Sequence, residues 1–132
     1  MVADVYGLIA GRLTAVFAAL GGWSVWPLNP PDSTGLPAVW AELSSGGGAS
    51  FEHPTMTPLV VRIVAVVAPQ PTANEHAAFA DVVDALDAGF RPPLAANIVT
   101  QSRSWTIDTV EVGGTDRNAV LYDLVTAHHP TC

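Results

Sequence analysis

The stretch that decides the fold runs from Pro58 to Pro69 and reads Pro-Leu-Val-Val-Arg-Ile-Val-Ala-Val-Val-Ala-Pro. Most of the residues between the two prolines are β-branched or aliphatic, which is typical of a buried strand. Each proline lacks a backbone N–H and is therefore expected to mark an end of that strand. Because both faces of the strand are apolar, we expect cover on both sides, from helices or from neighbouring subunits.

Arg62 is the exception in this stretch. It shares a strand face with Val60, Val64 and Val66, so its guanidinium needs a carboxylate partner or a path to solvent. Asp123, on the last predicted strand, is the candidate partner if the two strands are neighbours. The sequence therefore predicts a strand ion pair between Arg62 and Asp123.

A first helix is predicted over Asp4–Leu20, where apolar residues recur at helical spacing and Gly21-Gly22 ends the pattern. A second helix is predicted from about Ala73 to Ala88. Thr72 and Glu75 have the spacing of a capping box at its start, and Gly89 is a natural residue for the position just after its end.

The second helix carries two kinds of polar residue. His76 lies on its apolar stripe, where we expect a packed or hydrogen-bonded histidine rather than a metal ligand. Asp81, Asp84 and Asp87 lie mainly on the other side, where acidic residues three apart usually form a solvated face.

Further strands are expected around the central one. Residues 36–43 alternate and should pair antiparallel with the central strand. Residues 104–112 and 117–127 form a hairpin around Gly113-Gly114, since glycine accepts the positive φ that tight turns require. Residues 94–100 are a short strand or irregular chain. A short strand is also possible around Trp23–Leu28, where Trp23 and Trp26 are expected to cover an edge of the core.

This order predicts one α+β domain over residues 1–132, an antiparallel sheet of about four strands with two helices packed on one face. The other face still carries apolar residues from 58–69 and 117–127. Oligomerisation would cover that face.

Composition narrows the classes of function. Five arginines, no lysine and twelve acidic residues give a net charge of −7, which disfavours tight binding of nucleic acid. Charged residues make up 13% and hydrophobic residues 49% of the chain, against about 25% charged in a typical soluble domain. Either the core is well filled or other subunits cover part of the apolar surface. The single Cys132 allows no internal disulfide.

The N-terminus carries Asp4 and no basic flank, so it does not match a signal peptide. The stretch 58–69 is too short to span a bilayer as a helix. We therefore expect a soluble intracellular protein with no membrane partner.

The sequence shows no catalytic signature, no cofactor motif and no metal-ligand spacing. Residues 44–57 are polar and rich in glycine but lack the phosphate-loop pattern and any lysine. We expect them to form a long flexible loop, and residues 128–132 a flexible tail. Within the loop, the candidate assembly residues are Gly46, Gly47, Gly48, Phe51, Glu52 and His53.

The chain resembles the tail terminator proteins of long-tailed, non-contractile phages, particularly those of actinobacteria. The features that carry the resemblance are the helix before Gly21-Gly22, the strand that begins at Leu36-Pro37-Ala38-Val39, the glycine-rich loop, the 58–69 strand, the capped helix 72–88 and the hairpin through Gly113-Gly114. The absence of lysine also resembles proteins of high-GC phages.

The resemblance implies a structural virion protein at the neck-proximal end of the tail, assembled in the host cytoplasm. It implies a hexameric ring that ends the tail tube and contacts the tail tube protein and a neck or head-closure protein. DNA passes through the lumen of such a ring without sequence-specific binding, and an acidic surface suits a channel that does not grip it.

Three other interpretations stay open. The chain is alternatively a head-closure or other neck connector protein, which also forms rings of similar subunits. A different class is a small ferredoxin-like enzyme or ligand-binding protein, with His53, His76, Asp81 and Trp105 as pocket residues. A third is a protein–protein adaptor that forms no ring.

Overall fold

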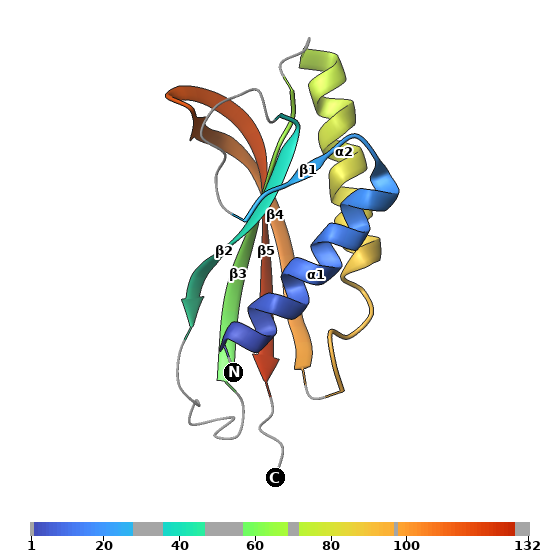
Figure 1. Cartoon of the computed structure of the whole chain (residues 1–132), viewed down its shortest axis with the longest axis vertical. Coiled ribbons are helices and arrows are strands. Elements are labelled where there is room, and N and C mark those ends of the chain that lie inside the picture. The colour runs from blue at the N-terminus through green and yellow to red at the C-terminus, as the bar shows by residue number, and fades with distance from the viewer. Residues whose placement is uncertain (1, 28–35, 47–56, 69–71, 97, 129–132) are drawn as a thin grey trace.

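The computed structural model describes residues 2–27, 36–46, 57–68, 72–96 and 98–128 (Figure 1). Helix α1 spans Val2–Leu20 and helix α2 spans Thr72–Gly89. The strands are β1 (Ser24–Val25), β2 (Ala38–Gly46), β3 (Thr57–Val66), β4 (Ile98–Val112) and β5 (Thr115–His128). The predicted α+β class, with two helices and a sheet, is therefore confirmed.

The strands form one sheet in the order β1-β2-β3-β5-β4, so the stretch from Pro58 supplies the central strand. Strands β2, β3, β5 and β4 pair antiparallel, as predicted, but β1 pairs parallel to β2. The predicted antiparallel sheet of about four strands thus differs from the structure only by β1, a fifth strand that pairs parallel and lies in the stretch 23–28 where a short strand was considered. The connection from Val25 to Ala38 is long enough for the crossover that a parallel pair requires.

Strand β4 is longer than the sequence indicated, because it begins at Ile98 rather than at Ser104. Its register against β5 shifts between Thr100 and Ser102, which interrupts the alternation on which the prediction depended. The turn that follows agrees with the prediction. Gly113 and Gly114 have φ of 58° and 81°, the positive values that a two-residue hairpin turn needs.

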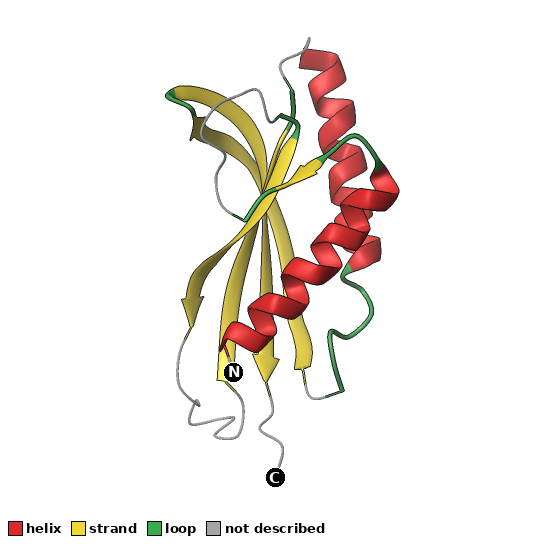
Figure 2. Ribbon diagram, in the orientation of Figure 1, coloured by secondary structure: helices red, strands yellow, loops and turns green. Residues whose placement is uncertain are grey.

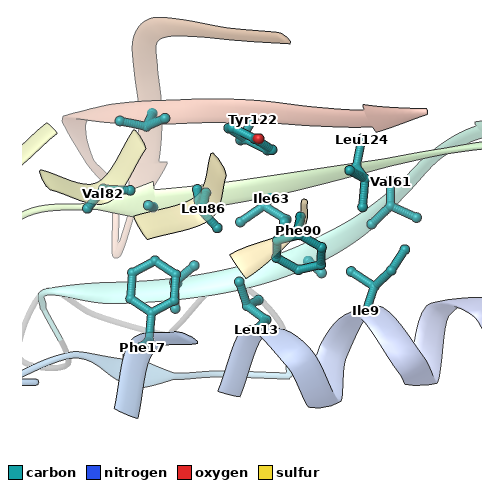
Figure 3. Close-up of a cluster of buried hydrophobic side chains, with 14 of the residues drawn as sticks. Ile9, Leu13, Phe17, Val61, Ile63, Val82, Leu86, Phe90, Tyr122 and Leu124 are labelled. Carbon is teal, nitrogen blue, oxygen red and sulfur yellow. The ribbon is translucent and has the colours of Figure 1, made fainter. Parts of the chain in front are cut away.

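Both helices cover the same face of the sheet (Figure 2). We call this the inner face. Figure 3 shows Ile9, Leu13 and Phe17 of α1 directed at the sheet, with Leu86 and Phe90 beside them. All five are at most 1% exposed. This cluster is the main core, and its burial is the chief stabilising contribution to the fold.

Gly89 has a different role from the one predicted. It is the last residue of α2 and has no positive φ. A Cβ added at Gly89 would lie 2.2 Å from Cγ2 of Val16 on α1. The glycine therefore serves the close approach of the two helices rather than a left-handed helix end. That left-handed role belongs to Gly21, with φ of 82° after α1.

The opposite face, which we call the outer face, has a core of its own. Trp40, Val64, Val66, Ala119 and Leu121 are buried there, and Trp26 and Leu36 pack against them. In Figure 1 the turn end of the β4–β5 hairpin bends away from the helices. Val112, next to that turn, belongs to the outer cluster. The chain itself therefore covers apolar residues for which the sequence analysis invoked a second subunit.

The two tryptophans near β1 pack against the core, as predicted. They do so on opposite faces of the sheet. Trp23 lies against Phe17, with ring centroids 5.1 Å apart, and belongs to the inner core. Trp26 packs on the outer cluster. The edge of the sheet at β1 is thus held from both sides.

Helix α1 contains an 18-residue window, Ala3–Leu20, that is long and apolar enough by composition to cross a membrane. The sequence was interpreted as having no long apolar run at the N-terminus, and this window differs from that expectation. Core helices and signal sequences pass the same criterion. Here α1 uses its large apolar residues for the core, and much of its exposed side consists of small residues such as Gly7, Gly11 and Ala15.

Candidate assembly interface

In the part of the chain that the structure describes, most of the large exposed apolar side chains lie on strands at the two borders of the sheet. Among the described residues, the large hydrophobic side chains that are exposed are Leu8, Val25, Leu43, Trp105 and Ile107. Trp105 and Ile107 lie on the edge strand β4. Val25 and Leu43 lie on β1 and β2, at the opposite border of the sheet, and Leu8 lies on the exposed side of α1. Where such side chains gather in one apolar patch, they mark a site of contact with other chains.

The first border contains an apolar groove of about 390 Å³ between α2 and β4. We call it the α2–β4 groove. It is lined by His76, Phe79, Ala80, Val83, Asp84, Trp105 and Ile107. Trp105 is 53% exposed and Ile107 is 40% exposed. Trp105 pairs with Tyr122 and Ile107 with Val120, so both lie on the inner face, beyond the part of the sheet that the helices cover.

Strand β4 also leaves its outer backbone edge open. It is 15 residues long, and within the described chain no strand pairs with it on the side away from β5. Every residue from Gln101 to Thr109 is exposed. A long exposed edge strand with flanking apolar side chains offers unpaired N–H and C=O groups to another chain.

The second border holds a hollow of about 310 Å³ between α1 and the β1–β2 edge. We call it the α1–β2 hollow. It is lined by Tyr6, Ala10, Leu13, Thr14, Val25, Trp26, Pro27 and Ala41. Two of these residues have polar groups near the border: the Tyr6 hydroxyl donates to the carbonyl of Ala41 at 2.7 Å, and Trp26 Nε1 is buried without a partner among the described residues.

The backbone at this second border is partly closed. The carbonyls of Pro37 and Val39 accept hydrogen bonds from the N–H groups of Ser24 and Trp26, at 3.0 and 2.9 Å. The next carbonyl along this edge of β2, that of Ala41, accepts a hydrogen bond from the Tyr6 hydroxyl. The two borders therefore differ: one presents an open strand and a projecting tryptophan, and the other a capped strand beside a hollow.

The predicted ion pair is present on the outer face. Arg62 and Asp123 lie directly opposite each other on β3 and β5. Arg62 Nε donates to Asp123 Oδ1 at 2.8 Å and a terminal nitrogen donates to Oδ2 at 3.1 Å. The hydrogen bond to Asp123 raises the pKa of Arg62. Glu42, opposite Arg62 on β2, accepts from Trp40 Nε1 at 2.7 Å.

A second polar cluster joins the end of α2 to the sheet. The buried Tyr122 donates its hydroxyl proton to Asp87 Oδ1 at 2.6 Å, and Arg103 donates to the Asp87 carbonyl at 2.7 Å. Burial, followed by the hydrogen bond to Asp87, raises the pKa of Tyr122. Asp87 is therefore a structural anchor rather than part of the predicted solvated face, on which Asp81 and Asp84 do lie exposed.

The structure describes only some of the other predicted site residues. In the loop, Gly46 ends β2 opposite Leu59, whereas Gly47, Gly48, Phe51, Glu52 and His53 lie outside the described residues, as do positions 129–132. His76 was expected to be packed or hydrogen-bonded; it is exposed, and it lines the α2–β4 groove. Asp81 does not line that groove. Within the described ranges, no group of three or more His, Cys, Asp or Glu side chains is placed to hold a metal ion.

Sequence reasoning missed most of the exposed apolar residues at the borders. Trp105 was named only as a pocket residue, and Ile107, Val25 and Leu43 were not singled out. One signal was available: Trp105 and Ile107 alternate with Thr106 and Asp108 along a strand. Alternation alone does not tell which of the apolar positions a helix will cover.

No protein-family model matches this chain. No curated protein matches it either.

Proposed function

We propose that this chain is a structural virion protein of the tail terminator type, whose copies form a closed hexameric ring at the end of a phage tail tube. The ring ends the tube and joins it to a neck or head-closure protein, and DNA passes through its lumen. The proposal assigns the chain no catalytic role.

One observation carries the proposal: the exposed large apolar side chains of the described strands divide between two opposite borders of a single sheet, Trp105 and Ile107 at one and Val25 and Leu43 at the other. A self-complementary patch would give a two-fold dimer, whereas two different patches on opposite sides give head-to-tail contacts. Head-to-tail contacts close into a ring when the rotation between copies divides a full turn. The number six comes from the resemblance to tail terminators.

The outer face supports the same function. On this face Asp123 neutralises Arg62 in an ion pair, and β4 presents Ser104, Thr106 and Asp108. With a chain net charge of −7, such a surface does not attract the phosphate backbone. A face of this kind suits the wall of a channel through which DNA slides.

The test is the mass and shape of the full-length protein. Light scattering after size-exclusion chromatography, with negative-stain imaging, is expected to show rings of six subunits that bind one end of purified tail tubes. A protein that stays monomeric, alone and with tail tubes, would overturn the proposal. Rings that bind filled heads but not tail tubes would instead assign the chain to the neck connectors.

A further inference from the structure

We infer that Trp105 of one copy inserts into the α1–β2 hollow of the next copy, and that Ile107 packs on Val25 beside it. This contact deepens the proposed function and rests on it, because it names the side chains that join neighbouring subunits. The occupant of the hollow is a second copy of this chain.

The positions of Trp105 and of the α1–β2 hollow along the strands follow from the pairing of residues across the sheet. Ala41 pairs with Ile63, Ile63 pairs with Tyr122, and Tyr122 pairs with Trp105. Residues directly opposite each other in an antiparallel sheet lie on the same face. Trp105 and Ala41 are therefore at one level and on the inner face, at opposite borders, and Ala41 lines the hollow.

Val25 and Ile107 can be compared in the same way, by following the paired residues across the sheet. Val25 pairs with Val39, Val39 with Ala65, Ala65 with Val120 and Val120 with Ile107. Val25 is 36% exposed and Ile107 is 40% exposed. These two exposed apolar residues thus also share a level and a face. A rotation about an axis parallel to the strands, with no shift along it, brings both pairs together in adjacent copies.

The directions of the two border strands also suit this contact. Strands β2 and β4 run in opposite directions, because three antiparallel pairings separate them in the sheet. The same rotation therefore places β4 of one copy antiparallel to β2 of the next. An isologous arrangement would instead place two copies of Trp105 at one interface and leave both hollows empty.

The chemistry of the two surfaces agrees. The hollow is lined mainly by apolar groups, and the Thr14 hydroxyl there already donates to the Ala10 carbonyl. A tryptophan buries a large apolar area on insertion. Tryptophan is also among the residues that most often dominate the energy of a subunit interface. Its 53% exposure leaves that area free in the isolated chain.

The experiment uses the full chain with Cys132→Ser, which removes its one cysteine. In that background Val25→Cys with Ile107→Cys is expected to give a ladder of covalent oligomers on oxidation. The matched control pairs Val25→Cys with Thr106→Cys, since Thr106 lies on the other face of β4, and gives no ladder. Either single cysteine variant alone is expected to stay uncrosslinked.

Trp105→Ala is expected to raise the concentration at which rings dissociate by about 30-fold or more, as loss of a hot-spot tryptophan does. Thr106→Ala leaves it unchanged. Both residues are exposed, so circular dichroism should show intact folding. Rings that withstand Trp105→Ala and give no Val25–Ile107 ladder would overturn this contact while leaving the proposed function standing. A monomeric wild type would overturn both, and a disulfide dimer of Ile107→Cys alone would replace the contact with an isologous one.

Discussion

Two sets of apolar side chains in this protein have similar chemistry and different surroundings. The set beneath α1 and α2, which includes Leu86 and Phe17, is almost completely buried. The set along the borders is exposed, and Leu43 and Trp105 in it are more than half exposed. Both sets lie on the inner side of the sheet. The difference arises because the two helices do not cover the sheet from edge to edge. The core residues stabilise the fold, and the border residues stay accessible to another chain.

The largest contrast is expected between Leu86→Ala and Leu43→Ala. Leu86 is 0% exposed, so its truncation leaves a cavity and should lower the free energy of unfolding by about 2–5 kcal/mol. Leu43 is 55% exposed, and its truncation should change that free energy by about 0.5 kcal/mol or less. Urea unfolding of the two variants measures both values. Equal losses would contradict the division into core and border.

The next effect concerns the bond between Tyr122 and Asp87, which ties the core to α2. Tyr122→Phe removes a hydrogen bond to a carboxylate and should cost about 1.5–3 kcal/mol at neutral pH. The pKa of Tyr122 is raised in the native protein, whereas in the unfolded chain it is about 10. The native state therefore keeps the proton longer, and stability that is fully present below pH 10 falls as the pH rises above it.

Urea titrations between pH 8 and 11 test this pH dependence. The unmodified protein should lose stability over the upper part of this range, and Tyr122→Phe should show a smaller alkaline slope. A slope that is identical in the two proteins would show that Tyr122 does not couple folding to protons.

A pair of glycines offers a third comparison, one at a helix contact and one in the open. Gly89→Ala forces a methyl group against Val16 and should destabilise the protein by about 1–3 kcal/mol. Gly11→Ala meets no atom within 4 Å and should stabilise α1 by up to about 1 kcal/mol. Thermal denaturation of both variants gives the signs. Adding Val16→Ala to Gly89→Ala should recover part of the loss, and no recovery would place the strain elsewhere.

The smallest effect is expected on the outer face. The Arg62 and Asp123 side chains are 39% and 27% exposed, and pairs of this kind contribute about 0.2–1 kcal/mol. Arg62→Gln and Asp123→Asn should each cost about that much, and the cost should shrink at high salt. A double-mutant cycle isolates the pair energy. A coupling well above this range would mean that the pair is shielded from solvent.

The sequence predicted those features that depend on short-range patterns. Helical spacing placed α1 and α2, the apolar stretch from Pro58 placed the central strand, and Gly113-Gly114 placed the hairpin. The Arg62–Asp123 pair also followed, because both residues interrupt strand faces that are otherwise apolar. Each of these inferences needs only the local period and one assumption about which strands are neighbours.

Features that depend on which surfaces meet were not predictable in the same way. The role of Gly89 depends on Val16, which lies far away in the sequence. His76 lies on the apolar stripe of α2, but at a point where the stripe faces the open groove rather than the core. The outer cluster forms because the long hairpin and Trp26 bring their own cover. No alternation in the sequence shows where that cover ends.

The central claim is that the two borders of the sheet join in a head-to-tail ring. Native mass measurement of the unmodified protein tests it most directly, with Trp105→Ala measured in parallel. The account predicts a single closed oligomer of more than two 13.7 kDa subunits for the unmodified chain and monomers for Trp105→Ala at the same concentration. A 13.7 kDa monomer at every concentration, or a dimer that ignores the Trp105 substitution, would contradict it.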